Sequence, residues 1–258
     1  MTTTRELDTV QLTARVKAMY TEVADAPDTE FHFETGRPLA LRLGYPVSQI
    51  DAIPPAAVES FAGVGYFLDL AGITRGETVL DLGSGSGTDT FLAARMAGPT
   101  GRVLAVDMTP AQLVKARRLA AESGGSPITF VEDRIETPPV EDASVDCIIS
   151  NGVINLVPEK DLVFRAAARA LKKGGRLALA DIVTSTRLPA GVTCDAALWA
   201  ACIGGAAQRD DYLGLIEAAG LHVEVVRDNP QYRFVSDRAL GATTAYGVTS
   251  ISLLARRR

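Results

Sequence analysis

Hydrophobic residues after position 77 fall into short, nearly continuous runs that alternate with segments of helical composition. The runs predict strands at residues 79–82, 103–107, 128–131, 145–150 and 176–183. The segments between them predict helices at residues 88–97, 110–122 and 159–171. Apolar strands that alternate with helices are typical of a parallel sheet covered on both faces.

The C-terminal part of the chain departs from this alternation. Two further helices are predicted, at about 194–202 and 210–219. Strands at 222–227 and 249–256 follow, and we expect no helical crossover of ordinary size between them. The last strand is therefore predicted to run antiparallel to its neighbour.

The residues before the first strand predict a separate helical layer. Apolar residues recur at helical spacing and predict one helix ending near Tyr20; they are Leu7, Val10, Leu12, Val16 and Met19. Shorter helices are predicted at 37–43 and 56–61. The glycine-interrupted segment 61–66 either folds over a bound ligand or merely joins this layer to the sheet.

Length and composition set the domain organisation. A chain of 258 residues with 47% hydrophobic residues buries one large core, or one core and a cap. We divide it into an N-terminal helical cap or lid, residues 1–73, and a core, residues 74–258. The sequence leaves monomer and homodimer open.

Charge and cysteine usage exclude several function classes. A net charge of −5 argues against a nucleic-acid partner, because such proteins carry basic stripes. No stretch reaches the ~20 apolar residues that a membrane helix needs, and the first ten residues lack the apolar core of a signal peptide. Three cysteines form no disulfide framework, so we expect a cytoplasmic protein.

The candidate ligand site begins where the strand at 79–82 enters three glycines, Gly83, Gly85 and Gly87. A strand, a glycine turn and a helix bring bare backbone and helix amides up to a ligand. The dinucleotide fingerprint G-x-G-x-x-G fails here, because its sixth position falls on Thr88 or Thr90. This spacing argues against a nicotinamide- or flavin-dependent oxidoreductase.

The pattern that is present, D-x-G-x-G-x-G from Asp81, resembles the first motif of the S-adenosylmethionine (SAM) dependent methyltransferases. The resemblance implies SAM as cofactor and methyl transfer as activity. It also implies a doubly wound, Rossmann-like α/β fold: a seven-stranded methyltransferase sheet with a terminal antiparallel strand.

Ligands of open parallel sheets bind at the carboxyl ends of the strands, which places the cofactor site. Asp107 ends the second strand and can accept hydrogen bonds from both ribose hydroxyls, while Met108 can pack on the adenine. Residues 109–112, Thr-Pro-Ala-Gln, predict a capping box, so Asp107 is not needed as the helix cap. Arg134 and Ile135 bound the adenine edge. The full expected cofactor set is Asp81, Gly83, Ser84, Gly85, Gly87, Asp107, Met108, Arg134, Ile135 and Asn151.

Four stretches make the resemblance more specific, since they are similar to the arsenite methyltransferases and their bacterial relatives. These stretches are residues 59–65, 98–110, 149–158 and 198–206. The third, Ser-Asn-Gly-Val-Ile-Asn-Leu-Val-Pro from Ser150, and the fourth, which contains Trp199, are uncommon in methyltransferases generally.

The chain departs from that family at its cysteines. Arsenite is thiophilic, and a site for it needs two or three converging thiolates. Val64 and Gly152 stand where the family carries cysteine, no cysteine precedes Cys147, and only Cys202 matches. Cys194 lies eight residues before Cys202, about 12 Å along a helix, which is too far to share one arsenic atom unless the helix is broken between them.

The candidate acceptor contacts are Tyr20, His32, Glu59, Val64 and Trp199, and the candidate catalytic residues are Asn151, Asp181 and Cys202. Asn151 follows the fourth strand, where methyltransferases place groups near the sulfonium. His32 acts as a base or simply packs between two phenylalanines. Asp181 faces the substrate or caps a turn. Cys202 is a relic of the scaffold or has a nucleophilic or soft-metal role, and no resident metal is expected.

The leading hypothesis is SAM-dependent methyl transfer to a small-molecule acceptor other than arsenite. A second hypothesis keeps arsenite, or a soft thiol-linked acceptor, held by Cys202 and exogenous thiols. A third, from another class, is a protein that uses SAM without methylating or that senses it.

Overall fold

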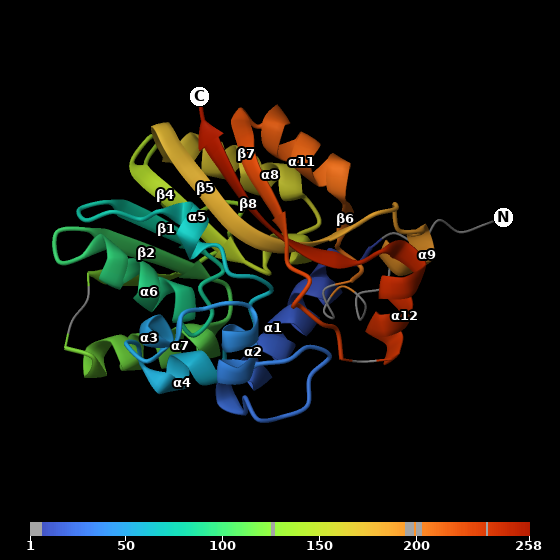
Figure 1. Ribbon diagram of the computed structural model, residues 1–258, viewed down its shortest axis with the longest axis horizontal. Coiled ribbons are helices and arrows are strands. Elements are labelled where there is room, and N and C mark those ends of the chain that lie inside the picture. Colours follow the sequence, from blue (N-terminus) through green and yellow to red (C-terminus); the bar gives the residue numbers. More distant parts are fainter. Residues whose placement is uncertain (1–6, 125–126, 194–198, 200–202, 236) are drawn as a thin grey trace.

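The computed structural model describes residues 7–124, 127–193, 199, 203–235 and 237–258. Its centre is one sheet in the order β3-β2-β1-β4-β5-β8-β7, with β6 paired to β5 (Figure 1). The strands are β1 (Thr78–Leu82), β2 (Arg102–Asp107), β3 (Ile128–Glu132), β4 (Val145–Asn151), β5 (Leu171–Thr184), β6 (Ala207–Gln208), β7 (Leu221–Asp228) and β8 (Thr249–Arg257). The predicted doubly wound α/β fold is therefore confirmed, with the two-residue β6 added.

Strand direction follows the expected pattern. Strands β1 to β5 pair in parallel, while β8 runs antiparallel to both β5 and β7. The prediction of an antiparallel last strand is confirmed. Because β2 and β4 flank β1 on opposite sides, the sheet switches direction of growth at β1, and ligands bind at such a point in open α/β sheets.

Helices cover both faces of the sheet. The core helices are α6 (Thr88–Ala97), α7 (Pro110–Glu122), α8 (Lys160–Ala170), α9 (Ala190–Thr193), α11 (Arg209–Ala218) and α12 (Asp237–Tyr246). Side chains alternate along each strand: Val79 and Ile149 join the cluster with α6, whereas Leu80 and Ile148 join the cluster with α8 and α11. Each face thus has its own hydrophobic core.

Two expectations about these elements are corrected, and a third is not tested. A helix, α12, lies between β7 and β8, where none was expected. Strand β5 starts at Leu171, so it begins five residues before the strand predicted at 176–183, and Leu171 belongs to this strand and not to the helix predicted at 159–171. The helix predicted at 194–202 falls mostly outside the described residues.

The N-terminal layer consists of α1 (Thr9–Asp25), α2 (Gly36–Arg42), α3 (Val47–Ile50), α4 (Pro55–Glu59) and α5 (Leu68–Ala71). Helix α1 continues five residues past the predicted end at Tyr20. Val10 is 79% exposed, so it does not belong to the apolar face on which it was counted.

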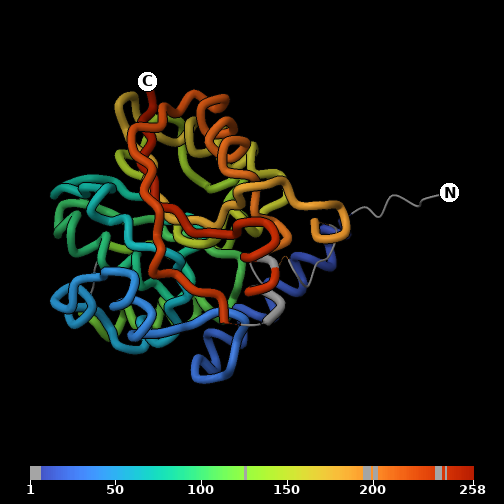
Figure 2. The backbone as a smooth tube through the Cα atoms, turned by 45° about the vertical axis from the view of Figure 1, so that its right-hand side comes forward, coloured from blue at the N-terminus to red at the C-terminus, as the bar shows by residue number. Residues whose placement is uncertain are grey.

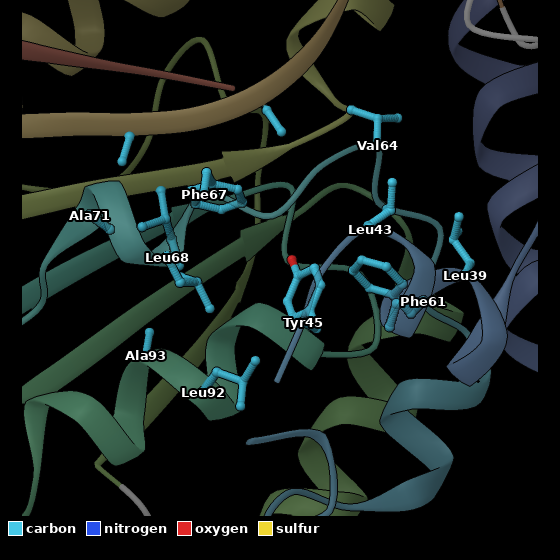
Figure 3. Close-up of a cluster of buried hydrophobic side chains, with 14 of the residues drawn as sticks. Leu39, Leu43, Tyr45, Phe61, Val64, Phe67, Leu68, Ala71, Leu92 and Ala93 are labelled. Carbon is cyan, nitrogen blue, oxygen red and sulfur yellow. The ribbon is translucent and has the colours of Figure 1, made fainter. Parts of the chain in front are cut away.

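Apolar side chains join this layer to the sheet domain. Phe61, Val64 and Phe67 share one buried cluster with Leu92 and Ala93 of α6 (Figure 3). The loop after α1 also meets the segment before α12, through an antiparallel bridge between residues 33 and 234 (Figure 2). Both contacts bring the N-terminal segment against the side of the sheet where β1, β2 and β4 end.

Candidate functional site

A cavity lies at the carboxyl ends of β1, β2 and β4. Its lining comes from α1, the segment 60–63, the glycine turn after β1, the end of β2, and the segments that follow β3 and β4. These are the strand ends at which the sheet switches direction, so the predicted location of the site is where the cavity is found.

Gly83 and Gly85 of the glycine turn line the cavity, but Gly87 does not. A Cβ at Gly87 would lie 2.9 Å from Cε2 of Phe91, and its φ is 98°, so packing and backbone shape require that glycine. The turn amides were expected to face a ligand. Four of them, from Gly83, Ser84, Gly85 and Gly87, instead donate to groups of the protein itself.

Ser84 supplies a polar atom for a ligand. Its hydroxyl Oγ is buried, has no hydrogen-bond partner, and belongs to a residue that lines the cavity. Beside it, a Cβ built at Gly85 would find its nearest neighbour 3.8 Å away, which leaves open space. A buried polar atom without a partner is unfavourable, and a polar ligand lying against the turn would satisfy it.

Asp107 is held at the end of β2 by two backbone amides. Gly85 N donates to Oδ2 at 2.9 Å and Thr109 N donates to Oδ1 at 2.7 Å. Burial raises the pKa of Asp107, and these hydrogen bonds oppose the rise. Each carboxylate oxygen keeps a lone pair, so the side chain is able to accept two hydroxyl groups from a ligand.

The predicted capping box is wrong. The Thr109 side chain makes no capping hydrogen bond. The Gln112 side chain turns away from the helix end, accepts from Ser86 Oγ, and donates to the backbone carbonyl of Tyr20 at 2.8 Å. Gln112 thereby ties α1 to α7 at the edge of the cavity.

The expected adenine contacts also line the cavity. Met108 is half-buried and Ile135 is buried. The guanidinium of Arg134 is half-exposed and forms an ion pair with Glu136, so its charge has a partner in the protein. These residues surround an apolar space beside Asp107.

Asp81 was expected to face the ligand, and the structure corrects this. Its side chain does not line the cavity, is 2% exposed, and accepts a hydrogen bond of 2.5 Å from Thr90 Oγ1. Burial raises the pKa of Asp81 to about 8, which favours its neutral form at pH 7. The last acid of the strand thus points beneath the turn.

Asp89, which sequence reasoning missed, is one of the acids that do line the cavity. It lies in the first turn of α6, and Tyr45 Oη donates to its Oδ1 at 2.6 Å. Asn151 Nδ2 donates to its Oδ2 at 2.9 Å. Burial raises the pKa of Asp89 to about 6, against the two hydrogen bonds. The sequence feature that could have predicted this residue is its place two residues after the last glycine of the motif.

Asn151 joins this acid to the segment 61–66. Its Oδ1 accepts from Val64 N at 2.8 Å and its Nδ2 donates to Gly65 O at 3.1 Å. A Cβ at Gly63 would lie 2.5 Å from Asn151 Nδ2, so glycine allows this close approach. Residues 61–63 line the cavity, and the segment therefore forms one of its walls.

The candidate acceptor contacts are not gathered in one place. Tyr20 lines the cavity, whereas His32 lines a second cavity near the loop after α1. Glu59 is exposed and lines neither of these cavities. Val64 is buried, and Trp199 is buried with its Nε1 donating to Thr193 O at 2.6 Å.

Asp181 does not face the cavity, because β5 continues to Thr184 and leaves this residue inside the strand. Tyr212 Oη donates to its Oδ2 at 2.6 Å and Ile182 N donates to its Oδ1 at 2.8 Å. Tyr212 belongs to the cluster on the α8 and α11 face. The expectation that Asp181 faces the substrate is therefore corrected.

The cysteines offer no thiol pair that the structure describes. Cys147 is fully buried in β4, and burial raises the pKa of its thiol to about 12. Cys194 and Cys202 lie outside the described residues. Within the described ranges, no three His, Cys, Asp or Glu side chains are placed to hold a metal, and no helix is long and apolar enough to cross a membrane.

Comparison with known proteins places this arrangement in context. A family model described as "Methyltransferase domain" matches residues 73–220. An arsenite methyltransferase of Halobacterium salinarum is 40% identical over 197 residues, which cover 76% of this chain and 50% of that protein. One of Aquipseudomonas alcaligenes is 36% identical over 189 residues, covering 70% and 54%. The chain thus spans about half the length of these curated relatives.

A solved structure extends the likeness. The crystal structure of an arsenic(III) S-adenosylmethionine methyltransferase from Chlamydomonas reinhardtii matches with a TM-score of 0.64 and 30% identity, covering 86% of this chain and 73% of that one. Geranyl diphosphate C-methyltransferase from Streptomyces coelicolor matches with a TM-score of 0.66 at 17% identity, covering 94% and 98%, which is a likeness of fold alone.

Proposed function

The chain belongs to the methyltransferase domain family and is related to the SAM-dependent arsenite methyltransferases, and we propose that it methylates a small organic acceptor with SAM. The observation that supports this most directly is the cavity itself. It has Asp107 beside an apolar space at one end, Ser84 in the middle, and Asp89 with Asn151 at the other. A nucleoside with a polar tail matches that sequence of groups.

The residues present fit SAM. Asp107 would accept the ribose hydroxyls, Met108 and Ile135 would flank the adenine, and the unpartnered hydroxyl of Ser84 would meet a polar group of the ligand. When bound, SAM supplies a methyl group activated by its sulfonium. The protein's own contribution is to position the acceptor in line with that group and to exclude water, the latter through Leu156 and other apolar lining residues.

The acceptor end supports a substrate other than arsenite. A Cβ built at Gly152 would lie 3.1 Å from Cγ1 of Val64, so these two positions are in contact. They are the positions at which the resemblance implies cysteines, and here they carry a valine and a hydrogen. A soft metalloid centre would find no thiolate there. Neither position lines the cavity, and Val64 is 1% exposed, so the pair does not itself form the surface offered to an acceptor. The lining nearby includes Val153, Leu156 and Val157, and this apolar surface suits an organic molecule.

The test is product analysis with purified protein and SAM. With arsenite and a thiol we expect no methylarsenicals, whereas an organic acceptor should give S-adenosylhomocysteine in equal amount to the methylated product. Clear conversion of arsenite would refute the proposed acceptor class. If arsenite is converted, a Cys202→Ser variant decides whether this cysteine holds it. Methylthioadenosine as product would instead indicate the non-methylating alternative.

The same proposal covers the roles of Asn151 and of the N-terminal residues, and the assembly and location of the protein. Asn151 positions the acceptor wall, and residues 1–73 act as a cap, because α1 contributes Leu12, Val16 and Tyr20 to the cavity. We propose a cytoplasmic monomer or homodimer without a nucleic-acid partner. Sedimentation velocity would test the assembly. Limited proteolysis with and without S-adenosylhomocysteine would test the cap, since closure over ligand should protect it.

A further inference from the structure

The position of Asp89 in the cavity follows from the strand order. Strand β2, which ends at Asp107, lies on one side of β1, and β4, which ends at Asn151, lies on the other. The adenine space beside Asp107 is built from residues that follow β2 and β3. A ligand with its ribose at Asp107 therefore extends its remaining ribose substituent across the glycine turn, toward Asn151 and Asp89.

The charges at that end are unbalanced. Asp89 is 8% exposed, and its two oxygens accept from neutral donors, Tyr45 and Asn151. No ion pair found among the described residues includes Asp89. Arg134 is the one basic side chain that the described part of the chain contributes to the lining, and Glu136 already pairs with it. A buried carboxylate without a cation is costly, so this end of the cavity favours a cationic ligand group.

Two features keep Asp89 ready for such a group. The first turn of α6 stabilises a negative charge through the helix dipole. Tyr45 Oη lies 3.0 Å from Asn151 Nδ2 as well as 2.6 Å from Asp89, so the three side chains fix one another. The unpartnered Ser84 hydroxyl is an independent sign that a polar ligand occupies this cavity.

We propose that Asp89 binds the α-ammonium group of the cofactor's amino-acid end, with Tyr45 and Asn151 positioning its carboxylate. This inference rests on the proposed function. Asp89 is thereby a cofactor contact in the place of Asp81, which the sequence pattern had included in the cofactor set. Asp81 is unsuited to it, because its carboxyl lies beneath the turn against Thr90.

The experiment compares two ligands by titration calorimetry with the full chain. S-adenosylhomocysteine carries the amino acid, and 5′-methylthioadenosine has the same nucleoside and thioether without it. In Asp89→Asn, affinity for S-adenosylhomocysteine should fall ~10- to 100-fold, the range expected for one hydrogen bond to a charged group, while affinity for methylthioadenosine stays the same. Asp161→Asn is the matched control, because Asp161 occupies the same first-turn position of α8 and faces solvent; it should change neither affinity.

A ligand-side measurement covers the case in which Asp89→Asn fails to fold. The wild-type protein should bind S-adenosylhomocysteine more tightly than its deaminated analogue, and Tyr45→Phe should reduce that preference without weakening methylthioadenosine. Equal loss for both ligands in Asp89→Asn, or no preference for the amino group in the wild type, would overturn the assignment. A far larger loss for SAM than for S-adenosylhomocysteine would overturn it too, since it would place the carboxylate at the sulfonium. If the wild type binds none of these nucleosides, the proposed function itself fails.

Discussion

Asp107→Asn tests how the cavity holds the nucleoside. The carboxylate accepts from two backbone amides and has one lone pair left on each oxygen for a ribose hydroxyl. Asparagine has one acceptor oxygen, so the variant loses the charge and places an NH₂ group against one of these amides or hydroxyls. Two hydrogen bonds to a charged acceptor contribute ~1.5–3 kcal/mol each, so we expect affinity for S-adenosylhomocysteine to fall by about 10² to 10⁴.

The ligand pair separates Asp107 from Asp89. Methylthioadenosine contains the ribose, so Asp107→Asn should weaken both ligands alike, whereas Asp89→Asn should spare methylthioadenosine. The assay is the same calorimetric titration, with thermal unfolding to verify that the variant is folded. Unchanged affinity would refute the ribose assignment, and so would a loss confined to S-adenosylhomocysteine.

Three further predictions concern the scaffold of the site. Gly83→Ala should lower the free energy of unfolding, measured with urea, by ~2–4 kcal/mol, because the φ of Gly83 is +80° and the new Cβ would overlap Val153. Adding Val153→Ala should recover part of this loss. If it does not, the steric explanation is wrong. Lys160→Met should cost ~2–4 kcal/mol, since the buried ammonium donates to two backbone carbonyls that would lose their partner; unchanged stability would show that water replaces it. Burial raises the pKa of Asp81 to about 8 from 3.8, so the folded state binds the extra proton and stability should fall as pH rises from about 4 to 8. Asp81→Asn should flatten this dependence, and an identical slope in both proteins would disprove the assignment.

The regular part of the fold could be predicted from the sequence because it depends on local patterns. The helix α6 and the strand β1 agree with prediction within one residue, since an apolar run, a glycine turn and a helical segment each have their own periodicity. The strand-end rule then placed Asp107 at the cavity, because parallel strands bring their carboxyl ends to one edge.

The orientation of individual acids could not be predicted in the same way. Successive side chains of a strand point to opposite faces, so an acid near the end of a strand can point away from the ligand even when the strand itself is predicted. Asp181 shows this, since its side chain lies against Tyr212 and does not line the cavity. The capping box failed for a related reason: Gln112 finds partners in Ser86 and in the backbone of α1, far away in the chain. Such tertiary contacts outcompete a local motif.

The two ends of the cavity are supported by different parts of the chain. The end with Asp107, where we propose that the nucleoside binds, depends on β1, β2 and the segment after β3. The wall at the other end depends on distant residues: Ser250 Oγ donates to Val64 O at 2.7 Å, and Ser252 Oγ donates to Tyr66 O at 3.1 Å. Both serines lie on β8 and bond Asn229.

This separation has a consequence for substrate choice. The hydrogen bonds that hold the segment 64–66 come from the side chains of Asn151 and the β8 serines and reach backbone groups, so they do not depend on which side chain stands at position 64. A cysteine or a valine at position 64 leaves these hydrogen bonds in place. Position 152 differs, since its φ of +70° disfavours any side chain. Under the proposed function, the side chain at residue 64 can therefore change while the groups around Asp107 stay intact. This fits the proposal that the chain uses the arsenite methyltransferase scaffold while keeping only one of the matching cysteines.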